Sequence, residues 1–334
     1  MQILLVAHDV GPSKALKKVS EVQKEGVRFV TLLCNGQSPS EDVVKQFEAI
    51  AAESDVVLCG ISSPAANAAI ERRMADVALA AGKKVGFFAD TFGAWSRPWL
   101  IPLRDRTSIV FVAHEDERMA AMDAFKRASA RALGNPNWDE YFLPRDREEA
   151  RARLGYERGE RIILSPGMKD PVLNIDLWTA VIGAARVAAK PLRVVLARHP
   201  GDRTDPELYA RLLSYGTEMA RIEFLPSTVT SDDAVPAVNV IVHTGNSSVG
   251  LHGLCRKIPV VDCRWMHLGD AYIERETGGW EQTPNAYQAT LQAFDRLQLA
   301  NHLEQAKPPP FGGSFIHQVP GESAKQIAAA LVDR

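Results

Sequence analysis

The segment from Val238 to Val261 contains residue types that could bind a phosphate group. Its apolar run, Val240–Val242, predicts a buried parallel strand, and a helical pattern follows over residues 249–255. Backbone N–H groups at the start of such a helix, together with the helix dipole, can hold a phosphate or diphosphate without a lysine. A tight strand-to-helix turn would use the same residues, but further segments favour an anion site. The polar turn consists of His243, Thr244, Gly245, Asn246, Ser247 and Ser248.

Two other segments of the second half could bring positive charge to that site. Residues 165–169 follow an apolar run and include Gly167 and Lys169, whose amide and ammonium groups could contact phosphate. Arg198 and His199 close the next run and could neutralise or hydrogen-bond a diphosphate. The alternatives are a Pro-Gly turn with a surface lysine, and a histidine that only shapes a turn.

Carboxylates stand at strand ends in the first half of the chain. His8, Asp9 and Gly11 follow the first apolar run. Gly11 would let the backbone approach a ligand closely, and Asp9 could act as a base. A role of Asp9 or Ser13 as a helix cap explains the segment equally well. Residues 60–64 are fully explained as the serine-capped start of a helix.

A second carboxylate, Asp90, follows the apolar run 84–88 and precedes an aromatic segment with Trp95 and Arg97. Aromatic rings stack on sugars, and an aspartate can orient or deprotonate a hydroxyl group. The segment could therefore form a pocket for a hydroxylated acceptor. A packed aromatic loop with a solvated arginine is the alternative.

Strands alternate with helices in both halves, which predicts two doubly wound α/β domains with mostly parallel sheets. We expect an N-terminal domain over 1–145 and a C-terminal domain over 146–334, with the charged, Gly/Pro/Trp-containing stretch 134–160 as linker and the last helix able to pack on the first domain. Ligands of such domains bind at the carboxyl ends of the strands. The expected strands are 3–7, 27–33, 56–59, 84–88, 108–112, 161–164, 192–197, 222–225 and 240–242, and the expected helices are 12–24, 40–53, 64–81, 115–127, 175–189, 205–214, 249–255, 286–302 and 322–332.

Composition narrows the class of protein. The chain has 334 residues, 46% hydrophobic and 24% charged, as in a soluble globular protein of two domains. A net charge of −2 gives no electrostatic reason to expect nucleic acid as a partner. We expect no signal peptide or integral membrane segment, and the four cysteines without a CxxC pair suit a reduced cytoplasm. No His/Asp/Glu cluster has zinc spacing, so no metal is expected.

The order of several motifs resembles the GT-B superfamily, in particular the group with UDP-N-acetylglucosamine 2-epimerases and CDP-glycerol glycerophosphotransferase-like proteins. The resemblance covers most of the second half and extends to the first half by topology alone. No single motif is specific; their order and spacing carry the resemblance. The matching segments are GNPNWDEY (134–141), ILSPGMKD (163–170), Arg198-His199-Pro200, HTGNSSVGLHGLCRKIPVVD (243–262) and PGESAKQIAAAL (320–331).

This resemblance implies two Rossmann-like domains facing a cleft and a glycosyltransferase-type reaction. A nucleotide-activated sugar or polyol phosphate would sit on the second domain, with its diphosphate at Gly245, Ser247 and Ser248, and with no cofactor beyond that co-substrate. Asp9 or Asp90 would deprotonate an acceptor hydroxyl. The alternatives are a 2-epimerase or NDP-sugar hydrolase, and a non-catalytic GT-B binding protein. A homodimer is one candidate for the oligomeric state.

The chain departs from the family pattern in two places. His252 stands where the family has a glutamate that holds the nucleotide ribose, and a neutral imidazole cannot replace a bidentate carboxylate. The several acid and base groups of the epimerases are also not evident in the first half. Only Asp9, Asp90 and the cluster Glu115-Asp116-Glu117 are candidates there, and the cluster could be no more than a charged helix start.

Overall fold

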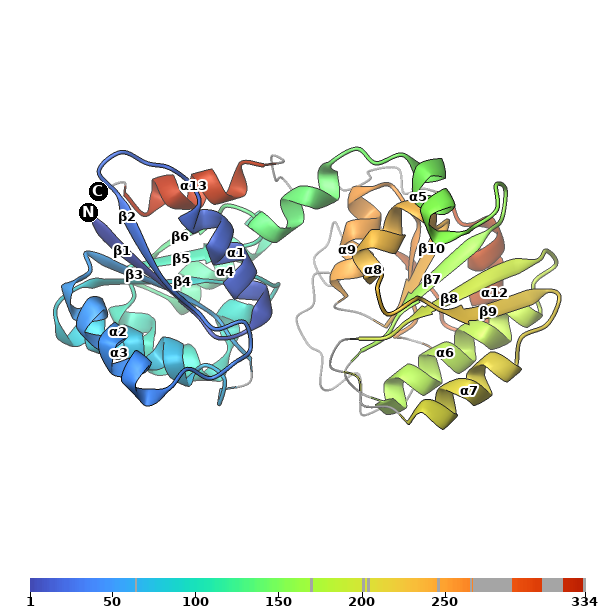
Figure 1. Ribbon diagram of the computed structural model, residues 1–334, viewed down its shortest axis with the longest axis horizontal. Coiled ribbons are helices and arrows are strands. Elements are labelled where there is room, and N and C mark those ends of the chain that lie inside the picture. The colour runs from blue at the N-terminus through green and yellow to red at the C-terminus, as the bar shows by residue number, and fades with distance from the viewer. Residues whose placement is uncertain are drawn as a thin grey trace. The chain divides into compact units, whose positions relative to one another are not determined.

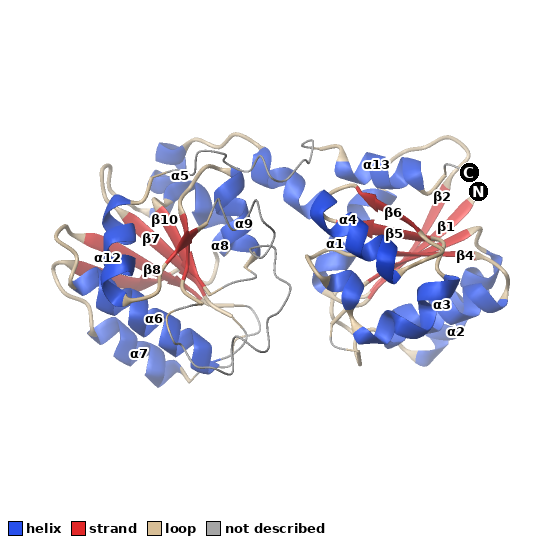
Figure 2. Cartoon of the chain, turned by 180° about the vertical axis from the view of Figure 1, so that it is seen from behind, coloured by secondary structure: helices blue, strands red, loops and turns tan. Residues whose placement is uncertain are grey.

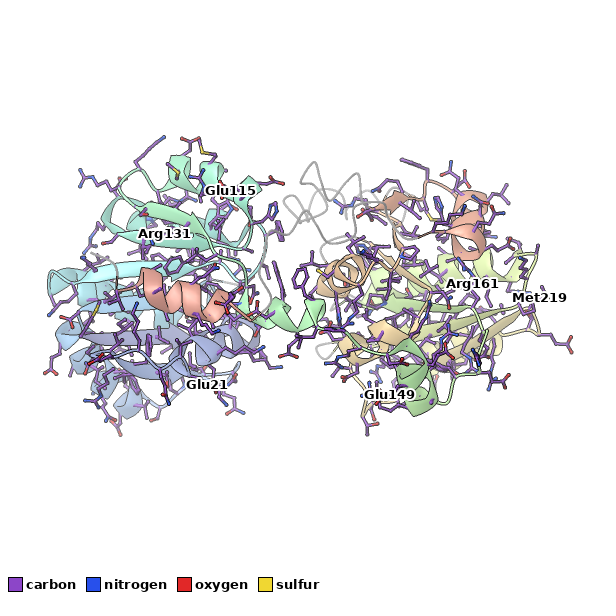
Figure 3. All side chains as sticks on the ribbon, turned by 90° about the horizontal axis from the view of Figure 1, so that it is seen from above. Glu21, Glu115, Arg131, Glu149, Arg161 and Met219 are labelled. Atoms are coloured by element: carbon purple, nitrogen blue, oxygen red, sulfur yellow. The ribbon has the colours of Figure 1, made fainter. Side chains whose placement is uncertain are left out.

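The computed structural model describes residues 1–63, 65–168, 171–199, 202, 205–244, 247–264, 266, 290–307 and 321–332. By internal contacts the chain forms two compact units (Figure 1). The first comprises Met1–Leu143 with Ile316–Arg334, and the second comprises Pro144–Phe315. In each unit helices flank a parallel sheet (Figure 2). Charged side chains such as Glu21, Glu115 and Glu149 are exposed (Figure 3).

The first unit contains a six-stranded sheet in the order β2-β1-β3-β4-β5-β6, with every neighbouring pair parallel. Since β1, β3 and β4 are neighbours, their carboxyl ends meet at one edge of the sheet. The strands are β1 (Gln2–Ala7), β2 (Arg28–Leu33), β3 (Val56–Gly60), β4 (Lys84–Phe88), β5 (Ile109–Val112) and β6 (Ser129–Ala132).

Helices cover both faces of this sheet because successive strand residues point to opposite sides. Leu4 and Val6 pack with α2, α3, α4 and η2, whereas Ile3 and Leu5 pack with α1 and the C-terminal α13. The helices are α1 (Val10–Ser20), α2 (Glu41–Glu53), α3 (Ala69–Ala80), α4 (Glu115–Ala124) and α13 (Ser323–Ala330), with the 3₁₀ helices η1 (Ala94–Ser96), η2 (Pro98–Arg106) and η3 (Pro136–Phe142).

The second unit repeats the plan with the strand order β12-β11-β10-β7-β8-β9, again with parallel neighbours. Trp178 on α6 is inaccessible and anchors the core that α6, α7 and α12 form with the sheet. The elements are β7 (Ile162–Pro166), β8 (Leu192–Ala197), β9 (Ala220–Phe224), β10 (Val240–His243), β11 (Val260–Asp262), β12 (Leu291–Gln292), α5 (Arg147–Leu154), α6 (Pro171–Arg186), α7 (Pro206–Ser214), α8 (Ser231–Ala234), η4 (Val235–Ala237), α9 (Ser248–Cys255) and α12 (Arg296–Gln305).

The alternation of strands and helices is confirmed in both halves, and some predicted boundaries are wrong. The predicted helix 286–302 includes Leu291–Gln292, which form β12, and the helix starts at Arg296 because Asp295 caps it by accepting from Gln298 N. The edge strand β6 was not expected, since its sequence SARA contains no apolar run. In the described parts of the chain, no helix is long and apolar enough to cross a membrane.

Candidate functional site

Asp90 lies at the carboxyl end of β4, and only 7% of it is exposed. Its Oδ2 atom is so close to the Cα of Gly11 that a Cβ at that position would overlap it. Gly11 therefore lets the start of α1 approach the carboxyl group. The Asn135 side chain donates to the Asp90 carbonyl oxygen at 2.6 Å and fixes the backbone there. The structure thus brings Asp90 and Gly11, two predicted site residues, into contact.

The environment of Asp90 suits proton exchange near neutral pH. Burial raises the pKa of Asp90 to about 7, the nearby Arg97 guanidinium opposes this shift, and the Asp9 carboxylate adds to it. A carboxyl group with such a pKa can accept or donate a proton at neutral pH, which a general base or acid must do.

Arg97 acts electrostatically on this carboxyl group and is half-buried, so it is not the solvated charge of the alternative interpretation. Its guanidinium donates to the Ile61 carbonyl oxygen. Burial lowers the pKa of Arg97, while the charges of Asp90, Asp9 and Glu71 raise it. One guanidinium thus interacts electrostatically with three carboxyl groups.

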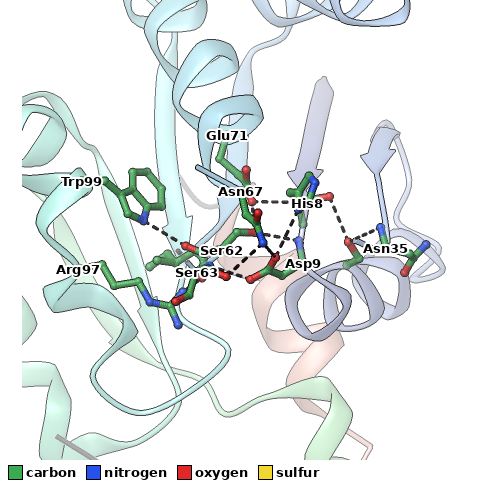
Figure 4. Close-up of polar contacts among 12 residues, drawn as sticks. His8, Asp9, Asn35, Ser62, Ser63, Asn67, Glu71, Arg97 and Trp99 are labelled. Carbon is green, nitrogen blue, oxygen red and sulfur yellow. Dashed lines mark hydrogen bonds and ion pairs between the residues drawn. The ribbon is translucent and has the colours of Figure 1, made fainter. Parts of the chain in front are cut away.

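The Asp9 carboxylate joins two loops (Figure 4). It accepts from Ser63 N at 2.7 Å and from Asn67 Nδ2 at 3.0 Å, and His8 Nδ1 lies 3.3 Å from Oδ1. Asp9 is the N-cap residue of α1, but its side chain makes no cap hydrogen bond there. The carboxylate therefore links the loop after β1 to the loop after β3.

A buried glutamate, Glu71 on α3, completes this link and was missed in the sequence. Its Oε1 atom accepts from His8 N at 2.9 Å and from the Ser62 hydroxyl, which in turn accepts from Asp9 N at 2.9 Å. Burial raises the pKa of Glu71, and its Oε2 atom has no hydrogen-bond partner in the described part of the chain. The available signal was the position of Glu71 on the helix face that also carries Met74, Ala75 and Ala78, which are all buried.

The cluster 115–117 divides into two exposed residues and one buried residue. Glu117 accepts at Oε1 from Gly93 N at 2.5 Å and from the Trp95 indole at 3.0 Å. Burial raises the pKa of Glu117 to about 7, and the charge of Asp116 adds to the shift. Glu117 is therefore more than part of a charged helix start, because it holds the segment that follows Asp90.

In the second unit, the predicted anion-binding segments lie at three neighbouring strand ends, those of β10, β7 and β8. Ser247 is the N-cap residue of α9, and Ser248 is its first residue. Thr244 Oγ1 lies 3.2 Å from Met168 Sδ, so the segments after β10 and β7 touch. His243 is the last residue of β10 and is buried. Three further candidates, Lys169, Gly245 and Asn246, lie outside the described residues.

The segment after β7 is held by α6. The Asn174 side chain accepts from Met168 N at 2.5 Å and donates to Met168 O at 2.8 Å. A Cβ on Gly167 would stand 2.8 Å from the Trp178 ring, so only glycine fits there without displacing the tryptophan. This candidate glycine therefore has a packing role whether or not it contacts a ligand.

Arg198 is held at the end of β8 by two residues that the sequence did not reveal. Its guanidinium lies over the Tyr209 ring at 4.7 Å, and its Nε is 3.7 Å from Asp202 Oδ2. The Tyr209 hydroxyl donates to the same carboxylate, and Asp202 N donates to His199 O at 2.9 Å. His199 therefore takes part in a turn, while Arg198 remains 48% exposed at its side chain.

His252 has both ring nitrogens engaged inside the second unit. Arg256 Nε donates to Nε2 at 2.7 Å, so the ring proton is on Nδ1, which lies 3.0 Å from Asp232 Oδ1. Burial lowers the pKa of His252, while Asp232 opposes this shift. The imidazole is neutral near pH 7 and already has an acceptor and a donor, so it is poorly placed to replace a ribose-binding carboxylate.

The sequence matches no protein-family model and no curated protein, whereas solved structures match over nearly the whole chain. The UDP-GlcNAc 2-epimerase from Neisseria meningitidis bound to UDP-GlcNAc has a TM-score of 0.65 at 13% identity over 100% of both chains. The Anabaena protein HepE in complex with UDP and glucose has a TM-score of 0.61 at 13% identity, again over 100% of both chains. A glycosyltransferase from Rickettsia africae has a TM-score of 0.55 at 13% identity over 98% of this chain and 91% of its own.

At this level of identity the likeness establishes the fold. The chain consists of two Rossmann-like domains of the GT-B fold, the fold of UDP-GlcNAc 2-epimerases and of GT-B glycosyltransferases. This confirms the predicted fold class. Among the described residues, no group of three or more His, Cys, Asp or Glu side chains is arranged to hold a metal ion.

Proposed function

We propose that the protein is an enzyme of the GT-B class that transfers a sugar, or a polyol phosphate, from a nucleotide-activated donor to a hydroxyl group. The observation that carries this proposal is Asp90, a buried carboxyl group with a pKa of about 7 at a strand end. Neighbours of the same fold were solved with UDP-GlcNAc and with UDP and glucose, which supports a nucleotide-sugar donor.

Asp90 acts as the base in this reaction. It takes the proton of the acceptor hydroxyl while the acceptor oxygen forms a bond to the anomeric carbon of the sugar. The bond between that carbon and the donor phosphate oxygen breaks, and the nucleoside diphosphate leaves with the electron pair. For a polyol phosphate donor the acceptor oxygen bonds to the phosphorus atom instead, the bond from that phosphorus to the bridging diphosphate oxygen breaks, and the nucleoside monophosphate leaves with the electron pair. Arg97 balances the negative charge that Asp90 carries before it accepts the proton, and the Trp95 ring offers a face for the sugar acceptor.

The donor diphosphate binds at the start of α9, where the hydroxyl groups of Ser247 and Ser248 and the backbone N–H groups of the first turn donate to it. Arg198, and Lys169 by its sequence position, offset the charge of the leaving diphosphate. Amides and cations of this kind can stabilise the leaving group without a metal ion.

A second candidate, a 2-epimerase or NDP-sugar hydrolase, is favoured by one observation. Glu117 as well as Asp90 has a pKa near 7, and elimination with re-addition needs two such groups. Glu117 already accepts two hydrogen bonds from its own domain at Oε1, so we propose Asp90 rather than Glu117 as the main proton carrier. Product formed without any acceptor would identify this reaction.

The first test is a thermal-shift panel of UDP, CDP, GDP and ADP and of their sugar conjugates, with the double variant Ser247→Ala/Ser248→Ala beside the parent. A ligand at 100 times its Kd adds about 2.7 kcal/mol of stability. We expect one nucleotide to stabilise the parent and to stabilise the variant less, because alanine removes the two hydroxyl donors and keeps the backbone N–H groups. No stabilisation by any nucleotide would contradict the proposal and favour the non-catalytic binding protein.

The second test is turnover with the donor so identified. Asp90→Asn should lower kcat by about 10²- to 10⁴-fold, the usual contribution of a general base. Asp123→Asn is the matched control because Asp123 is exposed and pairs only with Lys126 among the contacts of the described residues. Equal activity of both variants would remove Asp90 from the reaction.

A further inference from the structure

The first turn of α4 forms hydrogen bonds to the segment 93–95, which follows Asp90. The side chain of Glu117 accepts both the Gly93 N–H and the Trp95 indole N–H with a single oxygen, Oε1. Gly93 has a φ of 73°, a left-handed conformation that lets its N–H turn toward α4. The Phe92 ring stacks on His114, the N-cap residue of α4, with ring centroids 5.9 Å apart.

The carboxyl group of Glu117 makes no other hydrogen bond among the described residues. Its Oε2 atom is buried without a hydrogen-bond partner there, and the residue is 7% exposed. An acidic side chain is rarely buried without a strong reason, because removing a carboxylate from water is costly. The two bonds to Gly93 and Trp95 are the visible compensation for this cost.

Few other charges act on this carboxyl group. On α4 itself, Asp116 and Glu115 precede it, the N-cap His114 lies before them, and Arg118 follows it and pairs with Glu115 at 2.5 Å. Of the elements packed on α4, β5 and η1 carry no charged residue, β6 carries Arg131 (Figure 3), and Arg104 of η2 lies over the ring of Phe125 at the end of the helix. The carboxyl group is therefore held by its bonds to the 93–95 segment rather than by an ion pair with these groups.

We propose that Glu117 is a positioning residue of the Asp90 site: it holds the segment after Asp90 and orients Trp95 for the acceptor sugar. The expected effect of Glu117 on catalysis rests on the proposed function. The contact between Glu117 and Trp95 can be tested without any enzyme activity. Glu117 does not contact the reacting atoms in this scheme, and its effect passes through Trp95.

Ionisation of Glu117 changes the strength of its hydrogen bonds to the 93–95 segment. A carboxylate is a stronger acceptor than a protonated carboxyl group, so both hydrogen bonds strengthen when the proton leaves. Burial raises the pKa of Glu117 to about 7, so this change falls near neutral pH. The Trp95 indole then reports the protonation state of Glu117.

The experiment is a pH titration of intrinsic tryptophan fluorescence on the full chain, from pH 5 to 9. The difference between the parent and Trp95→Phe isolates the signal of Trp95. We expect a midpoint near pH 7 that disappears in Glu117→Gln. It should remain in Asp90→Asn and in Glu115→Gln, the exposed neighbour that serves as matched control. A midpoint that survives in Glu117→Gln, or the absence of any midpoint in the parent, would overturn the proposal.

Kinetics supplies the second measurement. Loss of one hydrogen bond to a charged group corresponds to about a tenfold effect at the lower end of its range. Glu117→Gln should therefore raise the acceptor KM by about tenfold with little change in kcat, and Trp95→Phe should do the same. Glu117→Asp should recover part of the loss only if the carboxylate itself is needed. A fall in kcat equal to that of Asp90→Asn would make Glu117 a proton carrier and refute the positioning role.

The two arms separate the proposals. If no transfer activity is found but the fluorescence midpoint depends on Glu117, the positioning contact stands and the proposed function fails. If Glu117→Gln does not fold, Trp95→Phe and Glu117→Asp are used instead. The shorter side chain of Glu117→Asp moves the carboxylate away from Trp95, so the fluorescence titration should change. A midpoint and amplitude equal to those of the parent would contradict the proposal.

Discussion

At Asp90, burial and neighbouring charges together set the pKa of the carboxyl group. Its position next to Gly11 excludes water from one side, and Arg97 balances its negative form. Asp9, the other predicted base, uses its carboxylate to bind Ser63 and Asn67 instead. Both aspartates stand at strand ends in the sequence, and only the contacts of the folded chain separate a candidate base from a link between loops.

Protonation of Asp90 should make the stability of the protein depend on pH. The folded-state pKa of about 7 is above the ordinary value of 3.8, so the folded state binds the proton more tightly and stability falls as pH rises from about 4 to 7. Asp90→Asn removes this loss and should therefore gain stability relative to the parent as pH rises toward 8. Each unit of pKa shift corresponds to about 1.4 kcal/mol.

Urea unfolding of both proteins at pH 5 and pH 8 measures this difference. Asp123→Asn, on the surface, should follow the parent at both pH values. An advantage of Asp90→Asn that is the same at pH 5 and pH 8 would mean that the carboxyl group does not titrate in this range.

At the scale of elements, the loops after β1 and β3 are joined through Glu71 of α3. Glu71→Ala removes the acceptor for His8 N and for the Ser62 hydroxyl and leaves a cavity in a fully buried position. We expect a loss of about 2–4 kcal/mol in the free energy of unfolding, from unsatisfied donors and the cavity together.

Urea titration measures this loss, with Arg72→Ala as control at the adjacent, exposed position of the same helix. Glu71→Gln keeps an acceptor oxygen and should lose less than Glu71→Ala. Glutamine keeps the side-chain volume and one acceptor oxygen and removes only the ionisable group. Equal losses in the glutamine and alanine variants would therefore show that the accepted hydrogen bonds and the volume contribute little.

The sequence predicted most strands and helices because their apolar runs and caps are local signals. Ser40 accepts from Val43 N as the N-cap of α2, for example. The apolar runs of β1, β3 and β4 are enough to predict that Asp9, the 60–64 segment and Asp90 follow strand ends of one sheet. Strand β6 escaped prediction because a short edge strand of small residues has no such signal.

The missed site residues depend on contacts between distant segments. Ser62 and Glu71 acquire their roles from His8 and Asp9, more than fifty positions earlier in the chain. The residues next to Glu117 in the sequence are those of an ordinary charged helix start. Glu117 is buried because the 93–95 segment packs on α4. Local sequence patterns do not predict these contacts, because they carry no information on which distant loops lie together in the fold.

At the scale of the molecule, each unit has a core of its own, but the first depends on the C-terminal end of the chain. Ile327 and Leu331 of the α13 region pack with Leu16 of α1 and with residues of β1 and β3. The fold of the first unit is therefore completed only after the whole second unit has been synthesised. Isolated Met1–Leu143 would expose this apolar face of α1.

This dependence predicts that a single substitution in α13 weakens the first unit alone. Ile327→Ala removes a fully buried side chain and should cost about 2–5 kcal/mol. Hydrogen exchange followed by mass spectrometry should show faster exchange in β1, β3 and α1, with β7, β8 and α6 unchanged. Leu303→Ala, in the core of the second unit, is the reciprocal control and should accelerate exchange there instead. Ile327 packs with residues of the first unit among the described clusters, so faster exchange in both units of Ile327→Ala would mean that they unfold as one cooperative body.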